Sequence, residues 1–378
     1  MANQQTQLFS SFISAGVTLP NRVVVSPMCE YSSEDGFSND WHLVHLGSRA
    51  VGGAGLLFTE AAAVLPEGRI TLNDLGLWKD EHIAGLERIV KFLHGQGARA
   101  GVQLAHAGRK AAMSRPWEPE RYIPDSEGGW QPVAPSALPF AEHYGKPLAL
   151  DQAGIDRVIE GFTMAAQRAW VSGFDVVEVH SAHGYLLHEF LSPLSNRRTD
   201  AYGGSFDNRI RLLLQVVDAI RRQLPDAVPI WVRISATDWA EGGWDLDQSV
   251  ALAKALKEHA VDLVDVSSGG LVPNVVIPAG PGYQTAFSAR IRREARIPTG
   301  SVGVITDPAQ AEHILRTCQA DVVLLARQML REPYWALHAA EKLGVPAPWP
   351  VQYLRAAPPG AQPRKPVAPI PLEEPLKV

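Results

Sequence analysis

The chain is poor in cysteine and has no long hydrophobic run. Its 378 residues contain two cysteines, Cys29 and Cys318, which cannot build a disulfide framework. No uninterrupted apolar stretch approaches the roughly 20 residues that a membrane-spanning helix needs. The first residues do not join a basic flank to an apolar segment, as a signal peptide does. We therefore expect a protein of the reducing cytoplasm that does not enter the membrane.

An excess of positive charge is also missing. The 40 acidic side chains outnumber the 35 lysines and arginines, which gives a formal net charge of -5. This balance argues against a nucleic-acid partner. Hydrophobic residues make up 46% of the chain, which is enough for a sizeable globular core. We expect the partner to be a small molecule.

Two motif classes are absent. No Gly-x-Gly-x-x-Gly follows the first or second predicted strand, so a Rossmann domain is not expected. His180 and His183 have the spacing of a possible metal pair, but no cysteine cluster and no His-Glu-x-x-His accompanies them. Since two ligands need a third before they can hold zinc, we expect no metal.

What the chain does contain is an alternation of buried strands and amphipathic helices. Helical stretches show one apolar face, as in Ile155, Val158 and Phe162, and Asp151 is placed to cap that helix. Eight strand-helix pairs favour a closed (β/α)8 TIM barrel over an open sheet. The predicted strands are 22–26, 55–60, 100–104, 175–179, 230–234, 263–266, 299–302 and 322–325.

Two regions fall outside this repeat. Residues 106–150, rich in Pro, Gly and Trp, follow the third strand on the face where barrels carry their active sites, so we expect a lid. Residues 356–378 are Pro-rich with little apolar periodicity, and we expect an extended or disordered tail. The barrel domain is therefore assigned to residues 1–355.

The fourth predicted strand runs directly into His180, His183 and Tyr185. Polar residues at the carboxyl end of a barrel strand are catalytic candidates. Neutral imidazoles donate N–H and a phenol donates O–H, so the three could polarise a carbonyl and deliver a proton to a carbon. The alternative of hydrogen-bonded core histidines stays open until the geometry is known.

The other strand ends supply further candidates. Arg233 would be costly to bury unpaired, so we expect it to face an acid such as Glu178, or a ligand that becomes anionic, such as a reduced flavin. Gln103 can donate to and accept from the same ring edge. Small residues after strands seven and eight favour a phosphate site, although they could equally be packing devices. The remaining candidates are Ser26, Pro27, Met28, Cys29, Tyr31, Ala61, Ser301, Gly303, Ala326 and Arg327.

With these residues in order, the chain resembles the old yellow enzyme family, in its short bacterial branch of xenobiotic reductases and thermophilic-type ene-reductases. Four motifs carry the resemblance, at 21–29, 101–110, 180–185 and 195–205, and it covers nearly the whole chain apart from the tail. It implies a barrel that binds FMN without a covalent link and takes hydride from NADPH or NADH. In the same pocket, by a ping-pong mechanism, it would reduce the C=C bond of α,β-unsaturated carbonyl compounds.

The resemblance also implies residue roles. His180 and His183 would bind the substrate carbonyl oxygen, Tyr185 would donate the proton, and Tyr31 would touch the substrate. Cys29 would tune the flavin potential, unless it is simply a small buried residue. The implied FMN ligands are Ser26, Pro27, Met28, Cys29, Ala61, Gln103 and Arg233 for the ring and ribityl chain, and Ser301, Gly303, Ala326 and Arg327 for the phosphate.

Two features near the end of the chain remain open. The segment 350–355 resembles an arm that sends an arginine into a neighbouring subunit, so Arg355 would complete the pocket in trans in a homodimer or homotetramer. Ala326 stands where relatives usually carry glycine, which would weaken FMN binding if the position needs a positive φ. Two other functions stay open as alternatives: a phosphate-binding barrel aldolase or isomerase, for which no Schiff-base lysine stands out, and a non-catalytic flavin carrier.

Overall fold

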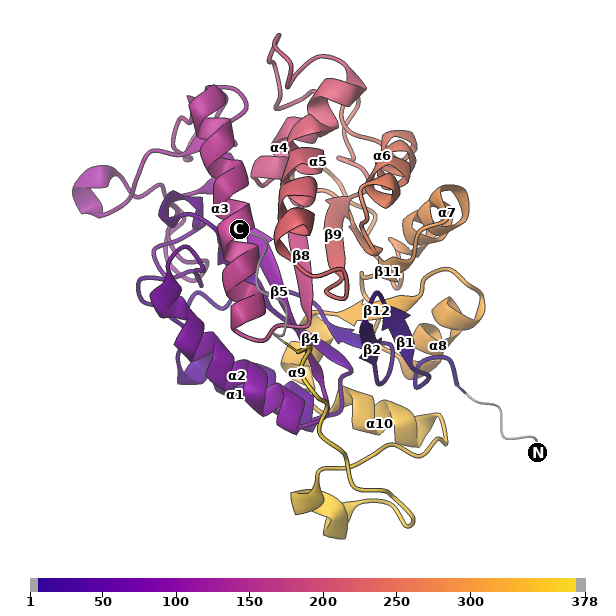
Figure 1. Ribbon diagram of the computed structural model, residues 1–378. Helices are drawn as coiled ribbons and strands as arrows, with labels where there is room; N and C mark the ends of the chain where they lie inside the picture. The colour runs from indigo at the N-terminus through magenta and orange to yellow at the C-terminus, as the bar shows by residue number, and fades with distance from the viewer. Residues whose placement is uncertain (1–5, 372–378) are drawn as a thin grey trace.

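Eight parallel strands close into a barrel in the computed structural model, which describes residues 6–371 (Figure 1). The ring closes where the last strand pairs with the first, Val323 opposite Val23. The predicted TIM barrel is confirmed, and every predicted strand is present with each end within three residues of the prediction. In ring order the strands are β3 (Val23–Val25), β4 (Leu56–Ala63), β5 (Arg99–Ala105), β8 (Val176–Ser181), β9 (Ile230–Ser235), β10 (Leu263–Ser267), β11 (Thr299–Ser301) and β12 (Val322–Leu325).

Burial on both faces explains the continuous apolar runs of these strands. Successive side chains point alternately into the barrel and out toward the helices, so Val24 joins an interior cluster while its neighbours join the outer core. A hairpin of β1 (Phe12–Ser14) and β2 (Val17–Leu19) adds apolar side chains to the interior cluster. Trp231 Nε1 donates to Ser14 Oγ at 3.0 Å, which fixes the hairpin beneath the barrel.

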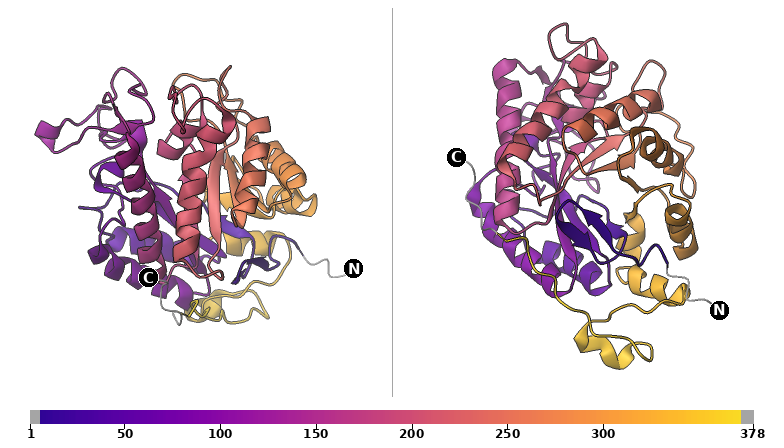
Figure 2. Two further views of the ribbon diagram at one scale, coloured as in Figure 1. Left: turned by 45° about the horizontal axis from the view of Figure 1, so that its top comes forward. Right: turned by 45° about the vertical axis from the view of Figure 1, so that its right-hand side comes forward.

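Helices surround the barrel and bury one apolar face against it (Figures 1 and 2). The predicted cap is confirmed, because the Asp151 carboxylate accepts from Gly154 N–H at 2.8 Å at the start of α3. The helices are α1 (Asp40–Val51), α2 (Ile83–Gly95), α3 (Gln152–Val171), α4 (Leu186–Leu191), α5 (Phe206–Gln223), α6 (Leu246–Glu258), α7 (Thr285–Ala295), α8 (Pro308–Arg316), α9 (Arg327–Arg331) and α10 (Trp335–Lys342). Within residues 6–371, no helix is both long and apolar enough to cross a membrane.

The excursion between β5 and α3 stands out beside α3 (Figure 2). It begins with the short helix η3 (Gly108–Lys110) and carries η4 (Asp125–Glu127) and a pair of short parallel strands, β6 (Val133–Ala134) and β7 (Leu148–Ala149). At its start the Lys110 ammonium donates to backbone carbonyls that follow β8 and β10. The excursion is therefore anchored at the carboxyl-terminal end of the barrel, where the strand-end candidates lie.

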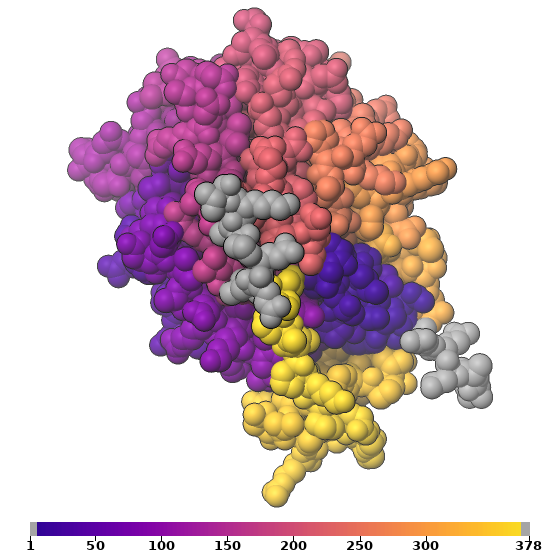
Figure 3. Space-filling view, in the orientation of Figure 1, coloured from indigo at the N-terminus to yellow at the C-terminus, as the bar shows by residue number. Residues whose placement is uncertain are grey.

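The end of the chain crosses the opposite face. After α10 it forms the short helix η5 (Val351–Ala356), which projects from the body, and then returns as an extended segment (Figure 1). This segment passes beside the amino-terminal hairpin (Figure 3). Of the tail assigned from the sequence, residues 372–378 lie outside the described residues. The described part, 356–371, forms no helix or strand after the end of η5. It makes one isolated bridge, between Pro363 and Trp349.

Candidate active site

Three ionisable side chains lie above the apolar interior cluster of the barrel. Glu178 on β8, Arg233 on β9 and Asp265 on β10 are all buried. Arg233 Nε lies 3.0 Å from Asp265 Oδ2, and Gln103 Nε2 donates to Glu178 Oε1 at 2.8 Å. Asp265, rather than Glu178, is therefore the acid in direct contact with Arg233. The sequence prediction named Glu178, which is the nearest acid by alternation but not the one opposite Arg233 in the sheet.

The register explains this pairing. Asp265 and Arg233 are opposite each other across β10 and β9, while Glu178 faces Trp231. Burial raises the pKa of Glu178 to about 8, and the like charge of Asp265 adds to the rise. Burial also raises the pKa of Asp265. Glu178 therefore holds its proton at neutral pH, and Asp265 is the acid that lies against the Arg233 guanidinium.

His180 and His183 lie together at the end of β8, with ring centroids 5.1 Å apart and planes 87° apart. The Nδ1 of His180 accepts from Ala182 N–H at 3.3 Å, which leaves the ring proton on Nε2. Desolvation, reinforced by the charge of Arg233, holds the pKa of both histidines well below the usual value. Both imidazoles are therefore neutral, and each offers an N–H donor.

The turn at His183 is held in an unusual backbone conformation. Its φ is +58°, in the left-handed region that non-glycine residues seldom adopt. Its N–H donates to Ser235 Oγ at 2.9 Å, its Nε2 lies 2.7 Å from Ser267 Oγ, and its carbonyl accepts from Lys110 Nζ at 2.8 Å. Burial lowers the pKa of Lys110 to about 7. Side chains from β9, β10 and η3 thus hold the backbone and the ring of His183.

Tyr185 lies at the start of α4, with its ring centroid 5.1 Å from that of His180 and the planes at 80°. Burial raises the pKa of its hydroxyl well above the usual value of about 10. The phenol therefore stays protonated across the physiological range. A protonated hydroxyl beside two imidazole donors can serve as a general acid.

The loop after β3 forms another wall. Ser26 is 1% exposed, and its Oγ has no hydrogen-bond partner within the described residues. Burial raises the pKa of Cys29, so this residue is a thiol rather than a thiolate. Tyr31 has a φ of +48° and meets Trp117 of the excursion edge-on, with centroids 6.0 Å apart. Burial raises the pKa of Tyr31, with Cys29 and Tyr185 as charge neighbours, which places the three side chains in one group.

A cavity of about 370 Å³ opens beside the ends of β11 and β12. Gly303, Ala326 and Arg327 line it together. Gly303 has a φ of +121°, whereas the φ of Ala326 is -99°, so alanine fits without the conformation that would require glycine. Ser301 does not line this cavity, because it is buried with its Oγ 3.3 Å from Thr285 Oγ1.

The unsatisfied polar atoms test whether FMN fits here. Ser26 Oγ and Glu178 Oε2 are buried and lack hydrogen-bond partners among residues 6–371, and the buried Arg233 Nε makes no hydrogen bond there although Asp265 Oδ2 lies 3.0 Å away. Each such atom costs roughly 1–3 kcal/mol unless a ligand or water satisfies it. FMN carries ring donors and acceptors that would pair with such atoms, and the cavity lined by Arg327 would take its phosphate, so the residues fit the group. No group of three or more His, Cys, Asp or Glu side chains in this part of the chain is arranged to hold a metal ion.

The remaining predicted residues have definite places. The first strand-end group lies after β3, Ala61 is buried in β4 beside Gln103 of β5, and Arg355 lies exposed on η5, away from its own barrel's site. Sequence reasoning gave no role to Asp265, Ser235, Ser267 and Lys110. Ser267 had a usable signal, because it directly follows the buried run 263–266, whereas the role of Lys110 depends on contacts to distant loops.

Comparisons with known proteins agree with this arrangement. The sequence model of the NADH:flavin oxidoreductase / NADH oxidase family matches residues 7–345. An NADPH dehydrogenase from Geobacillus sp. (strain WCH70) is 48% identical over 353 residues, which are 93% of this chain and 98% of that protein. Morphinone reductase in complex with tetrahydroNAD has a TM-score of 0.74 at 29% identity, over 92% of this chain and 93% of that chain. A 2-naphthoyl-CoA reductase complex has a TM-score of 0.80, but at 23% identity it shows the fold alone, and this chain covers 52% of its length.

Proposed function

Because the chain belongs to the NADH:flavin oxidoreductase / NADH oxidase family, the FMN-dependent old yellow enzymes, we propose that it reduces the C=C bond of α,β-unsaturated carbonyl compounds with NADPH or NADH as hydride donor. When bound, FMN would supply the hydride chemistry that links the nicotinamide to the substrate. One observation carries the proposal: two neutral imidazole donors lie beside a protonated phenol at the end of β8. Family membership sets aside the barrel aldolase or isomerase and the non-catalytic carrier.

The two histidines bind and polarise the substrate in this proposal. An enone carbonyl oxygen gains negative charge as hydride reaches the β-carbon, and N–H donors from His180 and His183 stabilise that charge. Neutral rings suit the task because each keeps one N–H donor and adds no further positive charge to the buried site beside Arg233. Tyr185 then supplies its hydroxyl proton to the α-carbon, which balances the hydride.

The surrounding residues would hold the cofactor and the substrate. Tyr31 would line the substrate side of the pocket, and the excursion 106–150 would act as its lid. Arg355 would complete the site of another copy in a homodimer or homotetramer, since it lies on a projecting element. The FMN ligands would be Ser26, Pro27, Met28, Cys29, Ala61, Gln103 and Arg233 at the ring and ribityl chain, with Gly303, Ala326 and Arg327 at the phosphate. Ser301, which does not line the cavity, would support the phosphate loop instead.

Anaerobic spectroscopy separates the two halves of this ping-pong scheme. We expect the purified protein to be yellow, to bleach with NADPH or NADH, and to recover its colour when 2-cyclohexenone is added. Saturated cyclohexanone is the matched control and should leave the protein bleached. A protein that bleaches but is not reoxidised by any activated alkene would contradict the substrate class while leaving the family assignment intact.

The two free cysteines are consistent with a cytoplasmic location.

A further inference from the structure

The returning tail has a regular three-residue pattern of burial. Ala361, Arg364, Val367 and Ile370 are half-buried, while the residues between them, including the prolines that alternate with them, are exposed. A period of three is that of the left-handed polyproline II helix, and Pro at every third position favours this conformation. The segment 361–371, here called the strap, lies beyond residue 345, where the match to the family ends.

Arg364 anchors the strap to the ends of two barrel helices. Its Nη1 donates to the carbonyls of Ala50 and Val51 at 2.5 and 3.0 Å, and to that of Gln96 at 3.4 Å. These carbonyls belong to the last residues of α1 and the residue that follows α2, where the helix dipoles are negative. Nε and Nη2 donate to Pro348 O at 3.3 and 3.0 Å. Burial lowers the pKa of Arg364 to about 10, so it remains a cation at neutral pH.

The strap backbone also bonds to the body of the protein. The N–H groups of Arg364 and Val367 donate to Trp349 O at 2.7 Å and His94 O at 3.0 Å. Arg99 Nη1 on β5 donates to Ala368 O at 2.7 Å. A free polyproline II helix has a fully solvated backbone, so these bonds indicate a specific docked register. Further along, Ile370 packs against the interior cluster that the hairpin of β1 and β2 completes.

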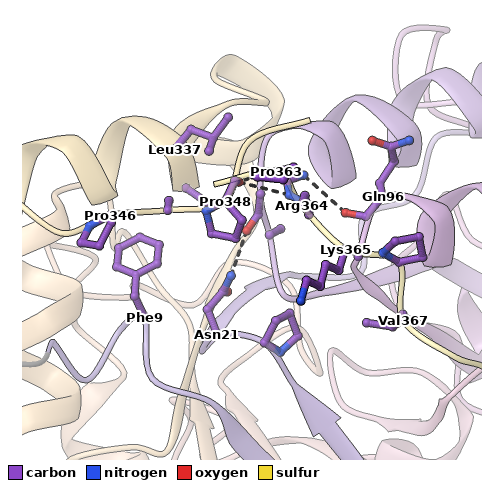
Figure 4. A pocket seen from close by; sticks show the side chains of 17 residues that line it. Phe9, Asn21, Gln96, Leu337, Pro346, Pro348, Pro363, Arg364, Lys365 and Val367 are labelled. Atoms are coloured by element: carbon purple, nitrogen blue, oxygen red, sulfur yellow. Dashed lines mark hydrogen bonds between the residues drawn. The ribbon is translucent and has the colours of Figure 1, made fainter. Parts of the chain in front are cut away.

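The barrel surface is shaped where the strap crosses it. A Cβ on Gly97 would lie 2.5 Å from Lys365 O, and one on Gly53 would lie 3.2 Å from Arg364 Nη2. These two glycines follow α2 and α1, so the helix ends let the strap approach closely. Where the strap does not contact the barrel surface, a cavity of about 390 Å³ lies between the strap, Phe9 and Leu337 (Figure 4).

We propose that the amino-terminal face of this barrel is a docking groove for a left-handed proline-rich helix, and that residues 361–371 of the same chain occupy it. The groove recognises a cation at the two helix ends and apolar side chains three and six residues further along. Docking ties α1, α2, β5 and the hairpin together. It also returns the chain after η5, so the arm 350–355 is held at both ends instead of ending freely.

Hydrogen exchange on the full-length protein, loaded with FMN, tests the proposal. We expect the strap amides of the unmodified protein to exchange at least tenfold more slowly than those of a free synthetic peptide of residues 360–371. Arg364→Ala should bring their exchange to within about twofold of the peptide. The neighbouring exposed Lys365 gives the matched control, and Lys365→Ala should retain the protection.

Two further readings keep the test decisive. The flavin absorbance of Arg364→Ala should match that of the unmodified protein, which shows that the barrel is still folded. If that variant does not fold, the comparison of the unmodified protein with the free peptide still decides. Exchange of the Arg364 and Val367 amides at the rate of the free peptide in the unmodified protein would overturn the docked strap. Protection that disappears on dilution to monomer would instead assign the occupant to a second copy and overturn the intramolecular assignment.

Discussion

At the residue scale, the arrangement of His180 and His183 predicts separable effects on the two half-reactions. Both imidazoles are neutral. The proposed function makes them donors to a developing oxyanion and gives them no part in the transfer of hydride to the cofactor. We expect His180→Ala or His183→Ala to slow flavin reoxidation by an enone about a hundredfold or more, the usual cost of losing one such donor. Anaerobic stopped-flow absorbance would follow both steps. Equal losses in flavin reduction and reoxidation would indicate a displaced cofactor and would contradict the role of the two histidines as donors to the substrate oxygen.

Glu178 gives a prediction for the dependence of stability on pH. A glutamate in an unfolded chain has a pKa of about 4.3, whereas burial raises that of Glu178 to about 8. Between these values the unfolded chain releases a proton that the folded chain keeps, so stability falls as pH rises through this window and stays lower above it. Glu178→Gln removes the titration. Relative to the unmodified protein, it should therefore gain stability between pH 5 and pH 9, by at most about tenfold in the unfolding equilibrium per pH unit.

Urea unfolding of the flavin-free protein at pH 5, 7 and 9 would measure this trend. Glu258, exposed at the end of α6, offers the matched control, and the effect of Glu258→Gln should not change over the same range. A stability difference for Glu178→Gln that is constant with pH would mean that Glu178 is ionised in the folded protein.

At the element scale, Lys110 joins the excursion to the loops after β8 and β10, and it does so through backbone carbonyls. Removing it should loosen the left-handed turn at His183 without touching the FMN residues. We expect Lys110→Ala to lower kcat/KM for an enone about tenfold to a hundredfold, since small misplacements of a catalytic group have effects of this size. The dissociation constant of FMN should change less than about twofold. Lys146→Ala, in the same excursion but exposed, is the control, and a similar loss there would assign the effect to the excursion as a whole.

The same scale shows what the sequence could and could not predict. Strands such as 263–266 were found because burial on both faces produces an unbroken apolar run, and barrel topology then brings their carboxyl ends together. Glu178 was the wrong prediction for the acid beside Arg233, because the register between two strands cannot be predicted from the pattern of one of them. In the register of β9 and β10, Asp265 is the residue opposite Arg233. The excursion was found as an insertion, but its path depends on contacts such as those of Lys110, which join residues more than 70 positions apart.

At the scale of the whole molecule, the arm that carries Arg355 projects from the body and exposes two apolar side chains, Val351 at 57% and Tyr353 at 45%. Because Arg355 cannot reach its own site from there, its proposed role requires a second copy whose barrel receives the arm. The strap fixes the base of this arm. A cyclic assembly would then place each arginine in a neighbour's pocket.

Co-expression of two inactive variants tests this exchange. A chain with Arg355→Ala has an intact barrel and a defective arm, whereas one with His180→Ala has an intact arm and a defective barrel. In a mixed dimer, one of the two sites then receives both intact parts, so random assembly should restore about a quarter of the sites. The measurement is enone reduction by the mixed preparation compared with each variant alone. Activity equal to the mean of the two variants would show that Arg355 does not act across the interface.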